Sequence, residues 1–338
     1  MLVTNAADGA RTLIGREGVL MAHREGSRPD RTALGIGLIL ASVTAMAFAD
    51  AVVKLVSADL TVWQVFVARS LVAIPIMIAL VVMTGGSVRP HAPGWVFVRC
   101  VLLVLTWLAF YVALPVLSLS VAAVAVYTNP IITALLSAAL IGEPVSRRRW
   151  AGVLLGFLGV IAILKPGTEA FSWFTILPLL AAVFYSLAMV LTRSKCQEEA
   201  PLTLSLTLHG TFLVTGLIAT GVMALLGLAA ETKAAFPFLL GDWGAMGARE
   251  WGLMALLGAL SAAYFVGVAR AYQIAAPSVI ATFDYAYLVS AALWGFVFFL
   301  EKPDLLTVGG MILITIAGLL VAAPPRKAAG KAPAGRPS

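Results

Sequence analysis

The stretch SVAAVAVYTNPIITALLSAALIGE (residues 120–143) decides the fold, because the chain repeats its pattern in SVIATFDYAYLVSAALWGFVFFLE (residues 278–301). A gap-free shift of 158 residues starts both copies on Ser-Val and aligns Tyr127 with Tyr285 and Glu143 with Glu301. Both copies are almost continuously apolar over the roughly 20 residues that a helix needs to cross the hydrocarbon core of a membrane. The sequence therefore predicts a membrane protein that uses one helix pattern twice.

Composition places most of the chain in lipid. Hydrophobic residues make up 61% of the 338 residues and charged residues 12%, whereas soluble domains have about 25% charged residues. The apolar runs are continuous instead of alternating, which favours helices over a membrane β-barrel. We predict an all-α integral membrane protein with ten transmembrane helices, at residues 34–56, 63–84, 95–114, 118–140, 149–165, 173–193, 202–228, 251–272, 278–300 and 305–323.

The distribution of basic residues orients these spans. With the N-terminus in the cytoplasm, sixteen Lys and Arg residues fall on the cytoplasmic side and five on the other, as the positive-inside rule requires. Disordered tails at 1–33 and 324–338 are then both cytoplasmic. The two copies are the fourth and ninth predicted spans, five positions apart, so they run in opposite directions. The halves 34–166 and 171–323 are therefore expected to be inverted five-helix repeats, an architecture suited to alternating access.

The segments that follow the repeated helix carry a family resemblance. They read GEPVSRRRWAGVLLGFLGVIAILKPG (142–167) and LEKPDLLTVGGMILITIAGLLVA (300–322), each a Gly-Glu or Leu-Glu turn before a Gly-rich helix. Together with FADAVVKLVSADLTVWQVFVARS (48–70), they resemble the EamA-type transporters of the drug/metabolite transporter superfamily. The resemblance implies a secondary transporter of the cell inner membrane, without cofactor or enzyme activity. Its substrate would be a small organic metabolite, such as riboflavin, S-adenosylmethionine or an amino acid.

Charged residues within spans are costly, so each needs a partner or an aqueous cavity. Asp50 either faces a cavity as a cation or proton site, or forms a local pair with Lys54 four residues later on the same helix face. Arg69 offers a planar fork of donors to a substrate carboxylate or phosphate, and the alternative is that it neutralises Asp50. Arg99 and Arg270 lie near predicted cytoplasmic span ends and are interpreted as topology anchors.

Two further ionisable residues are candidates for proton coupling. Asp284 lies inside the ninth predicted span with no basic residue near it in sequence, and its alternative role is a structural hydrogen bond to another helix. His209 aligns with Arg69 when RSLV (69–72) is set against HGTF (209–212). A packing histidine is the alternative to a proton relay there.

Aromatic residues within the predicted spans are further candidates for substrate contacts. They are Trp107, Tyr111, Tyr127, Tyr185, Tyr264, Tyr272, Phe283, Tyr285, Tyr287 and Trp294. Interfacial belts and helix packing account for many such residues. The repeat nevertheless singles out Tyr127 and Tyr285, and Tyr127 lies beside Asn129-Pro130, where a proline frees a backbone carbonyl. We predict substrate contacts from Arg69, Trp107, Tyr111, Tyr127, Asn129 and Tyr285, in a cavity suited to a flat or aromatic metabolite.

Several other functions lack their motifs. The chain has no GxxxxGK[ST], HExxH or GxSxG sequence, and only two cysteines, Cys100 and Cys196, so neither a Walker ATPase nor a Cys-rich metal site is expected. The basic residues lie at helix ends, which indicates topology instead of nucleic-acid binding. An integral membrane enzyme acting on a lipid-linked substrate is the alternative function. Glycine faces around Gly156 and Gly309 allow a homodimer seam, although packing within one chain is the simpler reading.

Overall fold

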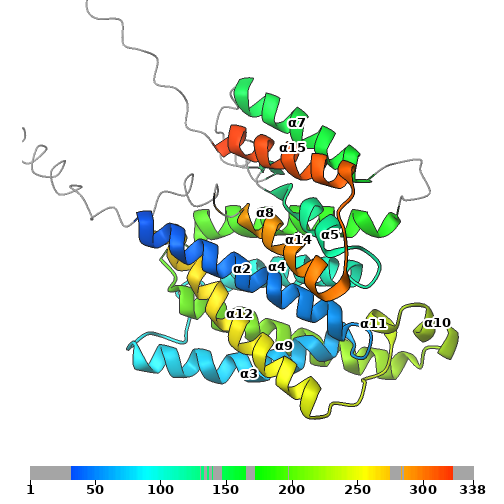
Figure 1. Cartoon of the computed structure of the whole chain (residues 1–338). Helices are drawn as coiled ribbons and strands as arrows, with labels where there is room; N and C mark the ends of the chain where they lie inside the picture. The colour runs from blue at the N-terminus through cyan, green and yellow to red at the C-terminus, as the bar shows by residue number, and fades with distance from the viewer. Residues whose placement is uncertain are drawn as a thin grey trace, which may run out of the picture.

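The computed structural model describes residues 32–322, except for residues 130, 133–134, 137–138, 140–146, 165–171, 197, 275–282 and 284. All regular secondary structure in these residues is helical (Figure 1). The long helices are α2 (Thr32–Val56), α3 (Val62–Met83), α4 (Pro93–Ala113), α8 (Ile176–Lys195), α9 (Pro201–Leu226) and α12 (Ala248–Ile274). The shorter helices are α5 (Leu119–Val126), α7 (Arg147–Leu164), η1 (Trp173–Thr175), α10 (Ala230–Ala235), α11 (Pro237–Leu240), α14 (Ala286–Phe299) and α15 (Leu305–Ala322).

Six of the described helices are long and apolar enough to cross a bilayer: α2, α3, α4, the segment of η1 and α8, α9 and α12. Shorter apolar helices occur within α7, α14 and α15. An all-helical membrane protein is thereby confirmed, and the six long helices start and end close to their predicted bounds. Parts of the fourth and ninth predicted spans lie outside the described residues, so the count of ten spans stays a prediction.

Local sequence signals explain where the helices begin and end. Thr61 caps α3 by accepting a hydrogen bond from the Gln64 backbone N–H at 3.2 Å, and Pro93 and Pro201 lie in the first turns of α4 and α9, where a missing N–H costs nothing. Gly227 stops α9 with φ of 54°, a left-handed conformation that glycine adopts readily. Between the predicted spans 202–228 and 251–272, the structure has the short helices α10 and α11.

Helices of the first half pack mainly against helices of the second half. Helix α2 packs on α12 and α14, α3 on α9 and α12, α4 on α8 and α9, and α5 on α8 and α14. Close crossings depend on glycine: a Cβ on Gly216 would lie 2.7 Å from Val67 Cγ2, and one on Gly258 would lie 2.8 Å from the Arg69 carbonyl oxygen. Such contacts let the α3 backbone approach both α9 and α12.

Helices α7 and α15 pack on each other and lie side by side at the top of Figure 1. The predicted glycine face of α7 is used in this contact. A Cβ on Gly159 would lie 2.8 Å from Ile314 Cγ1 and 3.2 Å from the Gly310 carbonyl oxygen. By contrast, a Cβ on Gly309 would have nothing within 4 Å. The glycine face of α7 is therefore filled within the chain, whereas Gly309 faces open space, and a homodimer stays a prediction.

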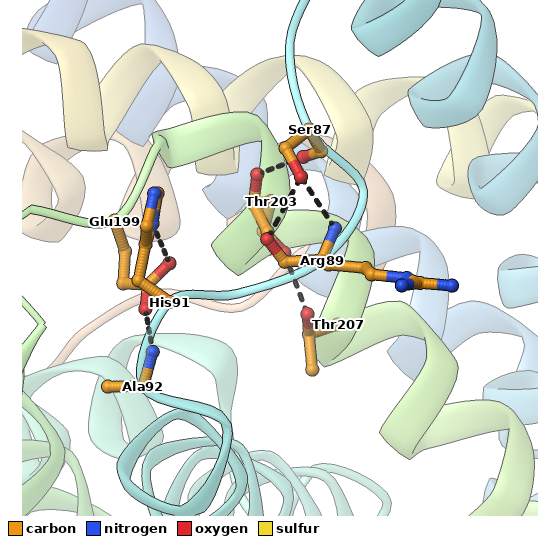
Figure 2. A network of polar contacts seen from close by, with 7 residues as sticks. All are labelled: Ser87, Arg89, His91, Ala92, Glu199, Thr203 and Thr207. Atoms are coloured by element: carbon orange, nitrogen blue, oxygen red, sulfur yellow. Dashed lines mark hydrogen bonds and ion pairs between the residues drawn. The ribbon is translucent and has the colours of Figure 1, made fainter.

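A polar network joins the two halves at the end of the bundle where α3 ends and α9 begins (Figure 2). Glu199 is 4% exposed and accepts hydrogen bonds from the Ala92 backbone N–H at 2.7 Å and from His91 Nδ1 at 3.4 Å. Next to it, the Thr203 hydroxyl donates to the Ser87 carbonyl oxygen at 2.6 Å. We call these five residues the Glu199 network. It ties the loop before α4 to the start of α9.

The Glu199 carboxylate gives this network a testable pH dependence. Burial opposes its charge, but the hydrogen bonds from Ala92 and His91 outweigh burial and lower the pKa of Glu199 below its usual value. A carboxyl group with a lowered folded-state pKa stabilises the fold above its unfolded-state pKa and loses that contribution as pH falls through the folded value. We expect Glu199→Gln to lower the free energy of unfolding by about 1–2 kcal/mol at neutral pH and to flatten the stability loss of the wild type under acid.

Thermal unfolding in detergent from neutral pH down to about pH 3, below the usual glutamate pKa, measures both effects. The matched control is Glu198→Gln, since Glu198 is the exposed neighbour and carries the same charge. Equal stability and equal acid response of the two variants would show that Glu199 does not hold the loops together.

Candidate functional site

Asp50 lies on α2 and is fully buried. The Tyr287 hydroxyl, from α14, donates a hydrogen bond of 2.6 Å to Asp50 Oδ2. Within the described residues, Asp50 Oδ1 has no hydrogen-bond partner. Lys54 instead bonds Glu301 Oε1 at 2.6 Å, so the local Asp50–Lys54 pair that the sequence left open does not form. Asp50 therefore accepts a hydrogen bond from a residue in the second half of the chain.

Arg69 lies on α3 with 1% of its surface exposed. Its Nη1 donates to the Tyr111 hydroxyl of α4 at 3.0 Å. The guanidinium carbon lies 4.5 Å from the ring centroid of Phe212 and 5.4 Å from that of Phe66, within the range of a cation–π attraction. Neither Nε nor Nη2 has a hydrogen-bond partner in the described part of the chain. Aromatic faces thus hold the cation, and two of its donor nitrogens stay unused.

Asp50 and Arg69 belong to one cluster. The charge of Arg69 acts on Asp50 and on the hydroxyls of Tyr111 and Tyr264, although Asp50 and Arg69 do not form a direct ion pair. The Tyr264 hydroxyl is buried and, like Asp50 Oδ1, lacks a partner among the described residues. We call Asp50, Arg69, Tyr111, Tyr264 and Tyr287 the central polar cluster. Each unpaired buried polar group costs about 1–3 kcal/mol, so the cluster is chemically suited to a polar ligand.

A small cavity adjoins this cluster. It has a volume of about 40 Å³, and three of the predicted substrate residues, Trp107, Tyr127 and Asn129, line it together with Tyr287. The Tyr127 ring stacks on the Tyr287 ring with centroids 4.8 Å apart and planes 16° apart, and it lies 6.0 Å from the ring of Tyr285. On this measure a single water needs about 10–15 Å³, so the cavity holds a few waters and is too small for an organic metabolite. The helices around it must separate before a substrate fits.

The residues predicted for proton coupling differ in their surroundings. His209 is fully buried, with Nδ1 2.9 Å from the Ser205 carbonyl oxygen and Nε2 2.9 Å from the Ser261 hydroxyl. Contacts on both ring nitrogens favour the packing histidine over the proton relay. Asp284 lies outside the described residues. Of the three coupling candidates, only Asp50 is placed in the central polar cluster.

Sequence reasoning did not select Tyr287 and Tyr264, although both were among the aromatic residues considered. The repeat directs attention to Tyr285, two residues before Tyr287, and no local signal distinguishes their roles. Phe212, which holds the Arg69 guanidinium, follows His209 by three residues and reads as an ordinary apolar position. Their role arises from contacts between helices far apart in sequence.

A separate and larger groove, of about 530 Å³, opens at the surface between α2 and α14. Leu40, Ala41, Thr44, Ala45, Phe48 and Trp294 line it. Trp294 is one of the aromatic residues considered in the sequence, but none of the residues predicted to contact the substrate lines this groove. Its lining is mostly apolar, as expected of a surface that faces lipid tails.

Comparison with known proteins identifies the class. The chain is 28% identical over 285 residues to the pseudopaline exporter of Pseudomonas aeruginosa, covering 83% of this chain and 94% of that protein. It is 23% identical to an S-adenosylmethionine uptake transporter of Rickettsia prowazekii, covering 85% and 92%. It is 30% identical to a riboflavin transporter of Rhizobium johnstonii, covering 70% and 72%. A solved crystal structure shares the fold, with a TM-score of 0.55, 19% identity and coverage of 88% of this chain and 99% of that one.

A helical membrane protein with a buried polar cluster and transporters as relatives is a transporter of small molecules. The family model of the EamA-like transporters matches residues 33–165, and the chain belongs to this family. Its function is the movement of a small metabolite across a membrane, and the lipid-linked enzyme is not favoured. The relatives include both an exporter and uptake transporters.

Proposed function

We propose that this protein is an inner-membrane secondary transporter that works by alternating access. Its inverted five-helix halves, 34–166 and 171–323, would be related by a two-fold axis in the membrane plane. The central polar cluster between them would bind the substrate near the midplane, as in other transporters built from inverted repeats.

The pattern of helix packing supports the two-fold relation. In two five-helix repeats, α2 corresponds to α8, α3 to α9, α4 to α12, α5 to α14 and α7 to α15. A two-fold axis would replace each helix by its counterpart. The contact α2–α12 then corresponds to α8–α4, and the contact α2–α14 corresponds to α8–α5. Both of these corresponding pairs are in contact. The pairs α3–α9, α5–α14 and α7–α15 map onto themselves and are also in contact. In a chain without internal symmetry, the helix contacts are not expected to be preserved when the two halves are exchanged.

The polar links at the two ends of the bundle fit the proposed orientation. Lys54 and Glu301 meet at the end where α2 and α14 finish. The Glu199 network lies at the opposite end, where α3 and α8 finish. With both termini in the cytoplasm, the first link would be outside and the second inside.

The substrate proposal rests on two buried groups of opposite charge that each have polar atoms without a hydrogen-bond partner. Arg69 has two free donor nitrogens and Asp50 a free acceptor oxygen among the described residues, and the stacked rings of Tyr127 and Tyr287 lie nearby. A carboxylate would satisfy the Arg69 fork, a cationic amine would satisfy Asp50, and a flat ring would stack on the tyrosines. The proposed substrate is therefore a small zwitterion with a planar group, a description that S-adenosylmethionine and aromatic amino acids meet.

Asp50 also supports a proposal for coupling. One carboxylate can hold either a proton or the cation of a substrate, but not both, so binding of one would release the other. Transport would then respond to a pH gradient. Asp284 and His209 are proposed as further coupling residues, although the contacts of His209 fit a packing role better.

Uptake into proteoliposomes tests this function. The panel consists of labelled S-adenosylmethionine, phenylalanine, tryptophan and riboflavin, with and without an imposed pH gradient, and protein-free liposomes as the control. We expect saturable transport of at least one of the zwitterions, faster in one direction of the gradient. Riboflavin is flat but has no carboxylate. If riboflavin is transported and none of the zwitterions is, the proposed substrate class is wrong. If the protein transports none of the compounds, the transport proposal fails for this panel.

A further inference from the structure

A single carboxylate joins three segments at the end of the bundle where α2 finishes. Lys54 Nζ donates to Glu301 Oε1 at 2.6 Å and also to the Leu117 carbonyl oxygen. The other oxygen of the same carboxylate, Oε2, accepts the Leu119 backbone N–H at 2.8 Å. Glu301 follows α14, Lys54 belongs to α2 and Leu119 begins α5. The contact therefore connects both halves of the chain at one end of the proposed substrate path.

The backbone around Glu301 is built to hold that carboxylate in place. Leu300 ends α14 with φ of 54°, the only positive φ at a non-glycine residue in the described chain. The Leu300 side chain is 75% exposed, so burial of this side chain does not offset the energetic cost of the left-handed backbone conformation. The turn brings the Glu301 N–H to 3.2 Å from the Gly295 carbonyl oxygen. A strained residue persists only where its surroundings enforce it, and here the surroundings are the contacts of Glu301.

Gly295 completes the arrangement. A Cβ at this position would lie 2.8 Å from Glu301 Oε2, so a side chain there would push the carboxylate away from Leu119. The carboxylate also lies at the N-terminus of α5, where the exposed N–H groups and the helix dipole favour a negative charge. Lys54 lies 5.1 Å from the Phe299 ring centroid, which adds a cation–π contact. Several independent features thus stabilise one ion pair.

The same helices carry the pair and the central polar cluster. Asp50 precedes Lys54 by about one turn of α2, and Tyr287, which bonds Asp50, lies on α14 ahead of Glu301. Two polar contacts therefore connect α2 with the α14 segment, one in the central polar cluster and one at the end of the bundle. The side chains of Lys54 and Glu301 are 12% and 16% exposed, so the ion pair is largely buried in the present conformation. The cavity of about 40 Å³ beside the cluster must enlarge before it admits a metabolite.

We propose that Lys54 and Glu301 form the gate on this face, and that their ion pair breaks when the central polar cluster opens to it. This proposal rests on the alternating-access function proposed above. Release of Glu301 frees α14 from α2 and uncaps α5 in the same step. Because Lys54 and Asp50 share one helix, a shift of α2 at the site moves the gate as well, a rigid-element coupling common in switching proteins.

Accessibility of a reporter cysteine tests the gate without relying on transport. Thr106 lines the cavity and is not part of the central polar cluster, so Thr106→Cys is placed in a Cys100→Ala, Cys196→Ala background. Intact cells are treated with a membrane-impermeant methanethiosulfonate. We expect Glu301→Gln and Lys54→Gln each to raise the labelling rate of the reporter about tenfold and the double variant to raise it no further, since both changes break one contact.

The matched control is a second ion pair of the same length at the same end of the bundle. Lys233 Nζ lies 2.6 Å from Asp242 Oδ1, but both residues lie between α9 and α12, away from α2 and α14. Asp242→Asn is expected to leave labelling and transport at their starting values. Labelling of Glu301→Gln equal to that of Asp242→Asn would overturn the gate.

A cross-link keeps the test decisive if a neutralised variant does not reach the membrane. Lys54→Cys and Glu301→Cys, in the Cys100→Ala, Cys196→Ala background and joined by a short cleavable bifunctional thiol reagent, should lose transport and regain it on cleavage. Continued transport by the cross-linked protein would overturn the gate. If instead the unmodified protein shows no transport, the alternating-access function fails, and this result is distinct from failure of the gate.

Discussion

Replacing Arg69 by glutamine should reduce transport by about thirtyfold or more. Arg69 is the central cation, with two donor nitrogens unpaired among the described residues, and we assign it to the substrate's anionic group. Losing one partner of a buried, hydrogen-bonded charge pair costs about 2–5 kcal/mol, and each 1.4 kcal/mol is a factor of ten. Initial uptake rates in proteoliposomes, at equal amounts of reconstituted protein, measure the loss.

Two further variants separate charge from geometry at Arg69. Arg69→Lys keeps the charge but loses the planar fork and its fit among Phe66, Tyr111 and Phe212, so an intermediate rate is expected. Arg249→Gln is the matched control, because Arg249 is 63% exposed and pairs with Asp59 and Glu250 away from the cluster. If Arg69→Gln transports as well as Arg249→Gln, Arg69 does not contact the substrate.

Replacing Asp50 by asparagine should have an effect of similar size and should also abolish the response to a pH gradient. Asparagine has nearly the same shape as aspartate, and its oxygen can still accept the Tyr287 hydroxyl that bonds Asp50 at 2.6 Å. The change therefore removes the negative charge and the protonation site with little change in packing. Uptake measured with and without an imposed gradient separates the two losses.

Tyr287→Phe and a double variant control for a structural role of Asp50. Tyr287→Phe removes the hydrogen bond and leaves the charge, so a smaller loss, about threefold to tenfold, is expected. If Asp50 and Arg69 serve only to neutralise each other, the Asp50→Asn, Arg69→Gln double variant should recover the transport and stability that each single variant loses. A double variant that folds but stays inactive is the result expected for a substrate site.

The positions of the long helices were predictable because lipid imposes them. A backbone in hydrocarbon must satisfy its hydrogen bonds internally, so continuous apolar runs become helices, and prolines and glycines such as Pro93, Pro201 and Gly227 mark their limits. The predicted bounds of the long spans accordingly lie close to those of α2, α3, α4, α9 and α12. The segment 227–247 was less predictable, since short helices such as α10 depend on local contacts outside the apolar runs.

The candidate site was only partly predictable. Arg69, Trp107, Tyr111, Tyr127 and Asp50 attracted attention because polar and aromatic groups within apolar helices are costly or unusual, and the structure places them around one centre. Their partners were not predictable. Local spacing favoured an Asp50–Lys54 pair, yet Asp50 bonds Tyr287, 237 residues away, and Lys54 bonds Glu301, 247 residues away.

The sequence by itself determined that this chain is a bundle of membrane-spanning helices related to metabolite transporters, because hydrophobicity and positive charge act along each segment independently. Only the tertiary structure decided which side chains meet. Contacts of α3 with α4 and α9 bring the rings of Tyr111 and Phe212 to Arg69, beside Phe66 of its own helix, and the contact of α2 with α14 brings Glu301 to Lys54. Such contacts depend on how helices cross in space, and no pattern along a single helix contains that information.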